Sequence, residues 1–206
     1  FSSVERAVKE NAKISKVLTY KGNDITVEAL DLLLANFTNN ENNKLDGKKI
    51  SILGAGNLGT KIAIKLLERG ANVNLFRRNQ IKLKKIIEAK NIIKPKFTKQ
   101  SITYFNDLNK ITKNADFIIG ATNGSQIIDN KILKNAKKNV IIVDVGKGTI
   151  THNAIREANE KNISLYRLDI TPALCGMLES NVYFDKIFRK TIGIKKFYNQ
   201  RLISGG

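Results

Sequence analysis

The chain has 206 residues, of which 36 are Lys or Arg and 18 are Asp or Glu, so its formal net charge is +18. This length suits one domain or slightly more and allows a sizeable core. The basic residues are spread along the chain, without a zinc-ligand cluster or an aromatic-rich basic stripe. The charge therefore does not by itself indicate a nucleic-acid binder, and it suits a phosphate-bearing ligand equally well.

The cysteine count and the hydropathy pattern indicate in which cellular compartment the protein is expected. Cys175 is the single cysteine, so no internal disulfide can form, and we interpret it as a small buried residue rather than a nucleophile. No stretch reaches the roughly 18 apolar residues of a membrane span, and no signal peptide is visible. A cytoplasmic location is expected. Because the chain starts at Phe1, we also expect that an upstream piece is missing.

The N-terminal part predicts two helices and a linker. Apolar residues recur at helical spacing over 3–15 and again over 26–37, with a Gly-Asn-Asp turn before the second helix. The polar run TNNENNKLDG that follows is interpreted as a linker. Residues 1–46 therefore form a helical segment ahead of the next part of the chain.

From residue 48 onward, short apolar strands alternate with helical patterns. The runs FIIGA and VIIVDV are continuously apolar, as strands buried on both faces are. This alternation predicts an α/β fold with a doubly wound parallel sheet, over 47–170. A helical segment over 171–206 is expected to pack back on the N-terminal helices. Strands are expected over 49–53, 71–76, 101–105, 116–121, 139–145 and 163–170, and helices over 57–69, 80–90, 107–113, 130–137 and 151–162.

Residues 50–60 read ISILGAGNLGT, in which an apolar strand runs into three glycines. The spacing is G-x-G-x-x-G, directly after a strand and at the start of a helix, which is the context of a dinucleotide-binding turn. Gly54 then permits the tight turn, Gly56 lets backbone approach a pyrophosphate, and Gly59 lets the helix pack on the strand. The alternative is a glycine-rich corner without a ligand.

The next predicted strand ends Phe76-Arg77-Arg78-Asn79, where an NAD site usually carries an Asp or Glu. Two guanidinium groups there can pair with a 2′-phosphate, which an acidic side chain would repel. We therefore expect NADP, with NAD the less favoured cofactor. The alternative interpretation of the arginines is a solvated strand end in a basic protein.

Two later strands end in the small or polar sequences ATNG and VGKGT. In open parallel sheets, ligands bind outside the carboxyl ends of the strands, so these two ends are expected to face the same crevice as the glycine turn. The predicted cofactor-binding residues are Gly54, Gly56, Asn57, Leu58, Gly59, Arg77, Arg78, Asn79, Ala121, Thr122, Asn123, Val145 and Gly146.

On these motifs the chain resembles the amino-acid-dehydrogenase-like NAD(P)-binding Rossmann family, which includes shikimate/quinate dehydrogenases, glutamyl-tRNA reductases and methylene-tetrahydrofolate dehydrogenases. The resembling segments are ITVEALDLLLANF, LDGKKISILGAGNLGTKIA, FRRN, ADFIIGATNG and VIIVDVG, within roughly residues 20–170. The resemblance implies a Rossmann domain over 47–170. It also implies that residues 1–46 link this domain to an upstream or partial substrate domain.

The resemblance further implies an NADP-dependent oxidoreductase, similar to shikimate dehydrogenase, that transfers a hydride between nicotinamide and a small carbonyl, alcohol or imine substrate. The alternative is a non-catalytic nucleotide-binding or regulatory Rossmann module. Besides the small-molecule substrate, a homodimer is considered. No membrane, nucleic-acid or metal partner is expected.

Hydride transfer needs one proton donor or acceptor from the protein. Lys21 and Asp24 are catalytic candidates because they flank the turn before the linking helix, where the resemblance places substrate-facing residues. Lys147 is a third candidate, in a strand-end loop near the expected nicotinamide. The single histidine, His152, and Asp169 in the last apolar strand are weaker candidates.

Overall fold

The computed structural model describes residues 2–15, 17–38, 45–96, 98–188 and 194–203. The chain divides into two compact units, Phe1–Ile170 and Thr171–Gly206. The break coincides with the predicted end of the Rossmann domain at residue 170. The first unit contains a six-stranded sheet and the helices that cover it.

The sheet of the first unit has the strand order β3-β2-β1-β4-β5-β6, and neighbouring strands are parallel throughout. After β3 the chain crosses back and places β4 on the other side of β1, so the strand order reverses between β1 and β4. This order confirms the predicted doubly wound Rossmann-like fold. The strands are β1 (Lys49–Leu53), β2 (Asn72–Phe76), β3 (Ile102–Tyr104), β4 (Phe117–Gly120), β5 (Ile141–Asp144) and β6 (Ser164–Arg167).

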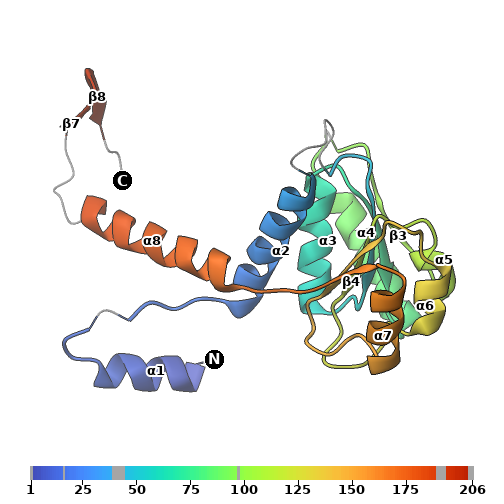
Figure 1. Ribbon diagram of the computed structural model, residues 1–206. Helices are drawn as coiled ribbons and strands as arrows, with labels where there is room; N and C mark the ends of the chain where they lie inside the picture. Colours follow the sequence, from blue (N-terminus) through green and yellow to red (C-terminus); the bar gives the residue numbers. More distant parts are fainter. Residues whose placement is uncertain (1, 16, 39–44, 97, 189–193, 204–206) are drawn as a thin grey trace. The chain divides into compact units, whose positions relative to one another are not determined.

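Helices cover both faces of this sheet (Figure 1). One face packs on α2 (Gly22–Thr38), α3 (Asn57–Glu68) and α4 (Gln80–Ile93), and the other packs on α5 (Leu108–Thr112), α6 (Asn130–Asn135) and α7 (His152–Glu160). Two separate apolar clusters result, because successive side chains of a strand point to opposite faces. Ile50 and Ile52 of β1 belong to the first cluster, whereas Leu53 belongs to the second.

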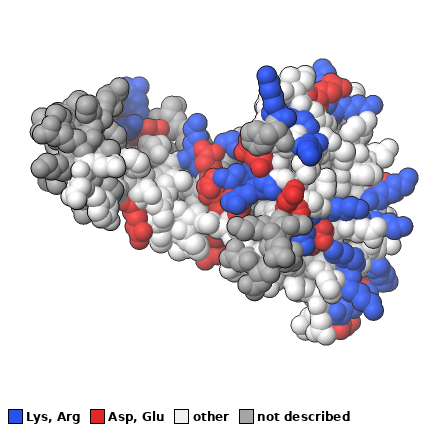
Figure 2. All heavy atoms as spheres, turned by 90° about the horizontal axis from the view of Figure 1, so that it is seen from above, with Lys and Arg blue, Asp and Glu red and all other residues white. Residues whose placement is uncertain are grey.

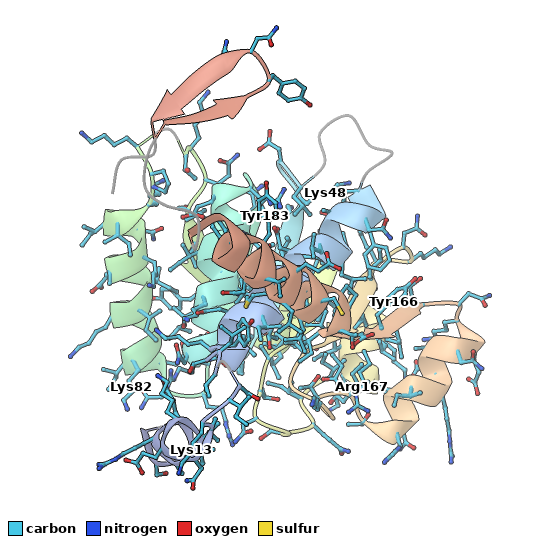
Figure 3. The ribbon with its side chains drawn as sticks, turned by 90° about the vertical axis from the view of Figure 1, so that its left-hand side faces the viewer. Lys13, Lys48, Lys82, Tyr166, Arg167 and Tyr183 are labelled. Atoms are coloured by element: carbon cyan, nitrogen blue, oxygen red, sulfur yellow. The ribbon has the colours of Figure 1, made fainter. Side chains whose placement is uncertain are left out.

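Charged and aromatic contacts fix α2 on the Rossmann sheet. The Asp31 carboxylate of α2 is buried and pairs with Arg69, the C-cap residue of α3. Near the C-terminal end of α2, the Phe37 ring contacts the ring of Tyr166 in β6, with 4.7 Å between the ring centroids. Tyr166 is labelled in Figure 3. The ion pairs follow both helices in the same direction, so α2 and α3 run parallel. These pairs are Asp24 with Lys61, Glu28 with Lys65, and Asp31 with Arg69.

The boundaries near the N-terminus differ in part from the prediction. The first helix, α1, covers Ser2–Asn11. The second, α2, begins at Gly22, so the predicted Gly-Asn-Asp turn is its first helical turn. The Thr26 hydroxyl donates to the Gly22 carbonyl, and the Asp24 N–H donates to the Lys21 carbonyl, so these polar groups find helical partners. Most of the predicted linker lies outside the described residues.

The second unit contains α8 (Thr171–Phe188) and an antiparallel hairpin of β7 (Ile194–Phe197) and β8 (Gln200–Ile203). The helical prediction for 171–206 therefore holds for α8 and is wrong for the hairpin. In the hairpin, the backbone N–H and C=O groups of β7 find their hydrogen-bond partners in β8, so this segment needs no helix to satisfy them. Cys175, expected to be buried, is exposed on α8. That this unit packs on the N-terminal helices stays a prediction.

The distribution of charge and the lengths of the helices bear on possible partners. Figure 2 shows Lys and Arg side chains spread over the visible face, with Asp and Glu side chains between them. A membrane-spanning helix needs about 20 predominantly apolar residues. In the part of the chain that the structure describes, no helix meets that requirement.

Asp116 joins the amino ends of β1 and β4 at the centre of the sheet. Its carboxylate accepts a hydrogen bond from the Lys49 N–H at 2.8 Å and pairs with Lys137. Burial by itself raises the pKa of this carboxyl, but the hydrogen bonds from Lys137 and Lys49 outweigh burial and hold the pKa below its ordinary value of 3.8. The ionised form is therefore stabilised by folding.

We expect Asp116→Asn to lower the free energy of unfolding by about 1 to 2 kcal/mol at pH 7. Because folding lowers the pKa, this contribution is fully present above the unfolded pKa of 3.8 and is lost as the pH falls through the lower folded pKa. Urea unfolding of both proteins from pH 7 to pH 3 measures the difference, which should shrink toward pH 3. Glu160→Gln removes an exposed carboxylate and controls for the change in net charge. A pH-independent difference would contradict the assignment.

Candidate functional site

A pocket of about 390 Å³ lies where the strand order reverses, outside the carboxyl ends of β1, β2 and β4. This is the position at which open α/β sheets bind ligands. Turns that follow the three strands form its wall. The lining residues are Gly54, Ala55, Gly56, Phe76, Arg77, Arg78, Asn79, Ala121, Thr122, Asn123, Ser125 and Ile127.

Two glycines of the turn after β1 are required by close backbone contacts. Gly54 has φ +123°, and a Cβ there would lie 2.6 Å from the backbone of Ala121. A Cβ on Gly59 would lie 1.9 Å from the Gly54 carbonyl oxygen. The roles predicted for these glycines, a tight turn and close packing of helix on strand, agree with these contacts.

Gly56 differs because its surroundings are open. A Cβ there would meet nothing within 4 Å, and its φ of −82° is available to any residue. The space beside Gly56 is part of the pocket, at the start of α3, where no side chain caps the helix. Uncapped N–H groups at a helix start favour an anionic group, so this end of the pocket fits a pyrophosphate. The Leu58 side chain packs against the core, so Leu58 can contact a ligand only through its backbone N–H. Asn57 is exposed and can contact a ligand through its backbone N–H or its side-chain amide.

The residues after β2 have three different environments. The Arg77 guanidinium is half-buried and donates from Nη1 to the Ala55 carbonyl at 2.6 Å. The Arg78 side chain is exposed at the pocket wall and, within the described residues, makes no side-chain hydrogen bond. Asn79 caps α4, because its Oδ1 accepts from the Lys82 N–H at 2.9 Å. The pocket thus brings these predicted residues together, with one free guanidinium.

The ends of β4 and β5 are packed together behind the pocket. The N–H groups of Val145 and Gly146 both donate to the Gly120 carbonyl at 2.9 Å. A Cβ on Gly146 would lie 2.0 Å from the Thr122 carbonyl oxygen. Ala121, Thr122 and the adjoining residue Asn123 line the pocket, whereas Val145 and Gly146 do not line it and contact the chain around Gly120 and Thr122.

Asp144 holds the loop after β5, a structural role that the sequence interpretation missed. It is 8% exposed and accepts hydrogen bonds from the Gly148 N–H at 2.7 Å and the Thr149 hydroxyl at 2.8 Å. These bonds hold the loop after β5, in which Lys147 has φ +57°. The available signal was an aspartate inside the otherwise apolar run VIIVDV, since buried carboxylates are rare without partners.

The three catalytic candidates do not line the pocket. Lys21 and Asp24 stand at the start of α2, and Asp24 pairs with Lys61 of α3, a partner that sequence patterns did not reveal. The hydrogen bond from Lys61 is the main cause that lowers the pKa of Asp24 below its ordinary value. Lys147 is exposed in its loop.

The weaker candidates also lie on the surface. His152 is exposed in the first turn of α7. Asp169 was expected within the last strand, but β6 ends at Arg167 and Asp169 is exposed beyond it. Among the described residues, no group of three or more His, Cys, Asp or Glu side chains is placed to hold a metal ion.

The parallel order, the glycine turn and the pocket at the strand reversal define an NAD(P)-binding Rossmann domain of the dehydrogenase type. Residues 36–169, more than half of the chain, match the family of shikimate / quinate 5-dehydrogenases. The chain belongs to this family, as the resemblance of its motifs predicted.

Two curated relatives match more than half of the chain. Glutamyl-tRNA reductase of Thermosipho melanesiensis is 30% identical over 125 residues, which cover 61% of this chain and 31% of that protein. An NAD(P)+ glycerol-3-phosphate dehydrogenase of Clostridium botulinum is 31% identical over 126 residues, which cover 57% of this chain and 35% of that protein. The chain thus spans about a third of the length of these relatives.

Solved structures share the fold at lower identity. Dipicolinate synthase from Bacillus subtilis is 20% identical, with a TM-score of 0.57 over 91% of this chain and 62% of that chain. Dipicolinate synthase from Bacillus halodurans is 16% identical, with a TM-score of 0.54 over 79% of this chain and 53% of that chain. At these identities the likeness concerns the fold alone.

Substituting two glycines of the turn separates folding from ligand binding. Gly59→Ala should destabilise the protein by about 1 to 3 kcal/mol, because its Cβ meets the Gly54 carbonyl. Gly56→Ala should change stability by less than about 1 kcal/mol, since its Cβ has space in the free protein. It should nevertheless weaken NADPH or NADH binding, because the methyl group occupies the pyrophosphate end. Urea unfolding and nucleotide titration measure the two effects. Undiminished nucleotide affinity in Gly56→Ala would place the ligand elsewhere.

Proposed function

We propose that the chain is the cofactor-binding part of an NADP-dependent oxidoreductase that acts on a small carbonyl, alcohol or imine, in the manner of a shikimate dehydrogenase. The observation that carries the NADP preference is the exposed Arg78 guanidinium at the pocket wall after β2. Neighbouring residues in this turn are Arg77 and Asn79, so no carboxylate from the turn opposes a 2′-phosphate.

The residues of the pocket suit the parts of a dinucleotide in order. The open space at Gly56 and the N–H groups at the start of α3 would hold the pyrophosphate. Arg78, with its free guanidinium, would pair with the 2′-phosphate of the adenosine ribose. The turn of Ala121 and Thr122, fixed by the Thr122 hydroxyl donating to the Ser125 carbonyl at 2.7 Å, would support the nicotinamide half.

The bound nucleotide would supply the hydride, and this chain would orient it and exclude water from one side. A proton donor or acceptor must come from near the substrate. Lys147, which follows Gly146 in the loop after β5, is one candidate for this group. Asp24 and Lys21 at the start of α2 are the other two candidates. The ion pair with Lys61 keeps Asp24 ionised, so Asp24 is better suited to accept a proton or bind a cation than to donate a proton.

A non-catalytic nucleotide-binding module is the second candidate function. It is favoured by one observation, that Lys21, Asp24 and Lys147 do not line the pocket. The two functions differ in turnover rather than in nucleotide binding. Formation of NADPH from NADP+ in the presence of shikimate, followed by fluorescence, would support the enzyme. Nucleotide binding without turnover of shikimate or related alcohols would support the module. A homodimer and a cytoplasmic location stay predictions in both cases.

The NADP preference is tested by titrating the chain with NADPH and NADH, using nicotinamide fluorescence. We expect tighter binding of NADPH, and a roughly tenfold to hundredfold loss of NADPH affinity in Arg78→Met, because a charge-assisted bond to phosphate is removed. NADH affinity should be little changed in that variant. Lys138→Met removes a positive charge before β5, near the amino ends of the strands and not the carboxyl ends where the pocket lies. This variant should leave both affinities unchanged. Equal losses for both nucleotides in Arg78→Met would contradict a 2′-phosphate contact.

A further inference from the structure

The glycine turn after β1 and the turn after β2 are joined by three hydrogen bonds. The N–H groups of Gly54 and Ala55 both donate to the Phe76 carbonyl at 3.0 Å. In the opposite direction, Arg77 Nη1 donates to the Ala55 carbonyl at 2.6 Å. The bond from Arg77 is the one of these three that depends on a side chain, so it is the one that the sequence can add or remove.

The Arg77 main chain is itself held in place. Its carbonyl accepts a hydrogen bond from Gln80 Nε2 at 2.6 Å, within the first turn of α4. The guanidinium thus reaches from the turn after β2, whose main chain is bonded to the first residue of α4, across to the glycine turn. Arg78 next to it is exposed and makes no side-chain hydrogen bond to the described residues. Two adjacent, chemically identical side chains therefore have different structural environments.

The acceptor of this bond lies at a sensitive position. Ala55 stands between Gly54 and Gly56, and glycine backbones have the greatest conformational freedom in the unligated chain. A bond to the carbonyl between two glycines restricts the turn before any ligand arrives. A site that is already in its binding conformation loses less entropy on binding, which increases its affinity. Both nucleotides share the pyrophosphate that this turn receives.

We propose that Arg77 is a positioning residue that holds the glycine turn in its nucleotide-binding conformation, while Arg78 alone discriminates NADPH from NADH. The assignment rests on the proposed nucleotide-binding function of the pocket. Arg77 acts through Ala55 on the part of the site common to both cofactors. Arg78 acts on the 2′-phosphate, which only NADPH carries.

The test compares Arg77→Met with its matched neighbour Arg78→Met, with NADPH and NADH as probes. Arg77→Met should weaken both nucleotides by a similar factor, roughly tenfold, and leave their affinity ratio unchanged. Arg78→Met should reduce the ratio. Arg77→Lys, which keeps a donor of similar reach, should recover part of the affinity for both nucleotides. A selective loss of NADPH in Arg77→Met would overturn the proposal, because Arg77 would then contact the phosphate.

A second measurement does not depend on nucleotide binding. Amide hydrogen exchange of residues 55–60 in the ligand-free protein should be faster in Arg77→Met than in the unsubstituted chain or Arg78→Met, by more than the change in the global free energy of unfolding accounts for. Unchanged exchange in Arg77→Met would overturn the positioning role. If Arg77→Met unfolds, Arg77→Lys provides the same comparison. Failure of the unsubstituted chain to bind either nucleotide would overturn the proposed function, while the exchange data would still decide whether Arg77 holds the turn.

Discussion

The start of α3 lies so close to the end of β1 that no side chain fits between them. A Cβ on Gly59 would come within 1.9 Å of the Gly54 carbonyl, and one on Gly54 within 2.6 Å of the chain after β4. Three backbone segments therefore meet without intervening side chains. This contact places the start of α3 at the pocket, where its N-cap residue Gly56 forms part of the lining, and brings the turn after β4 close to it. The binding geometry depends on the absence of two side chains rather than on any added one.

Charge then gives the two ends of the pocket different properties. The end at Gly56 offers backbone N–H groups, which attract any phosphate. The end at Arg78 offers a guanidinium, which can distinguish a nucleotide that carries a 2′-phosphate from one that does not. The Arg77 guanidinium, by contrast, donates a hydrogen bond to the Ala55 carbonyl. In the proposed function, general affinity for dinucleotides and preference among them would thus come from different chemical groups, one in the turn after β1 and the other in the turn after β2.

The ion pairs between α2 and α3 attach α2 to the helices that cover the sheet. Exposed pairs such as Glu28 with Lys65 contribute little individually. Asp31 differs because its carboxylate is buried, so loss of Arg69 would leave its charge compensated by the more distant Lys65, whose Nζ lies 3.8 Å from Asp31 Oδ2. Since the helices run parallel, the start of α2 lies at the same edge of the sheet as the start of α3. Lys21 and Asp24 are therefore held at the edge of the sheet where the nucleotide would bind.

The local sequence by itself determined the order of strands and helices between residues 48 and 170 and the position of the glycine turn. Continuous apolar runs, glycine spacing and the Arg-Arg-Asn strand end are signals that act over a few residues, so they can be interpreted without contacts. The same local signals failed where the outcome depends on distant partners. The first turn of α2 resembled a loop, and the strand pairing of β7 with β8 was mistaken for helix. Only the tertiary structure decided that Asp24 meets Lys61, that Asp144 holds the loop after β5, and that Arg77 and Arg78 differ in environment. The physical reason is that hydrogen bonding and burial depend on which atoms the fold brings together, and identical neighbouring residues carry no local sign of that difference.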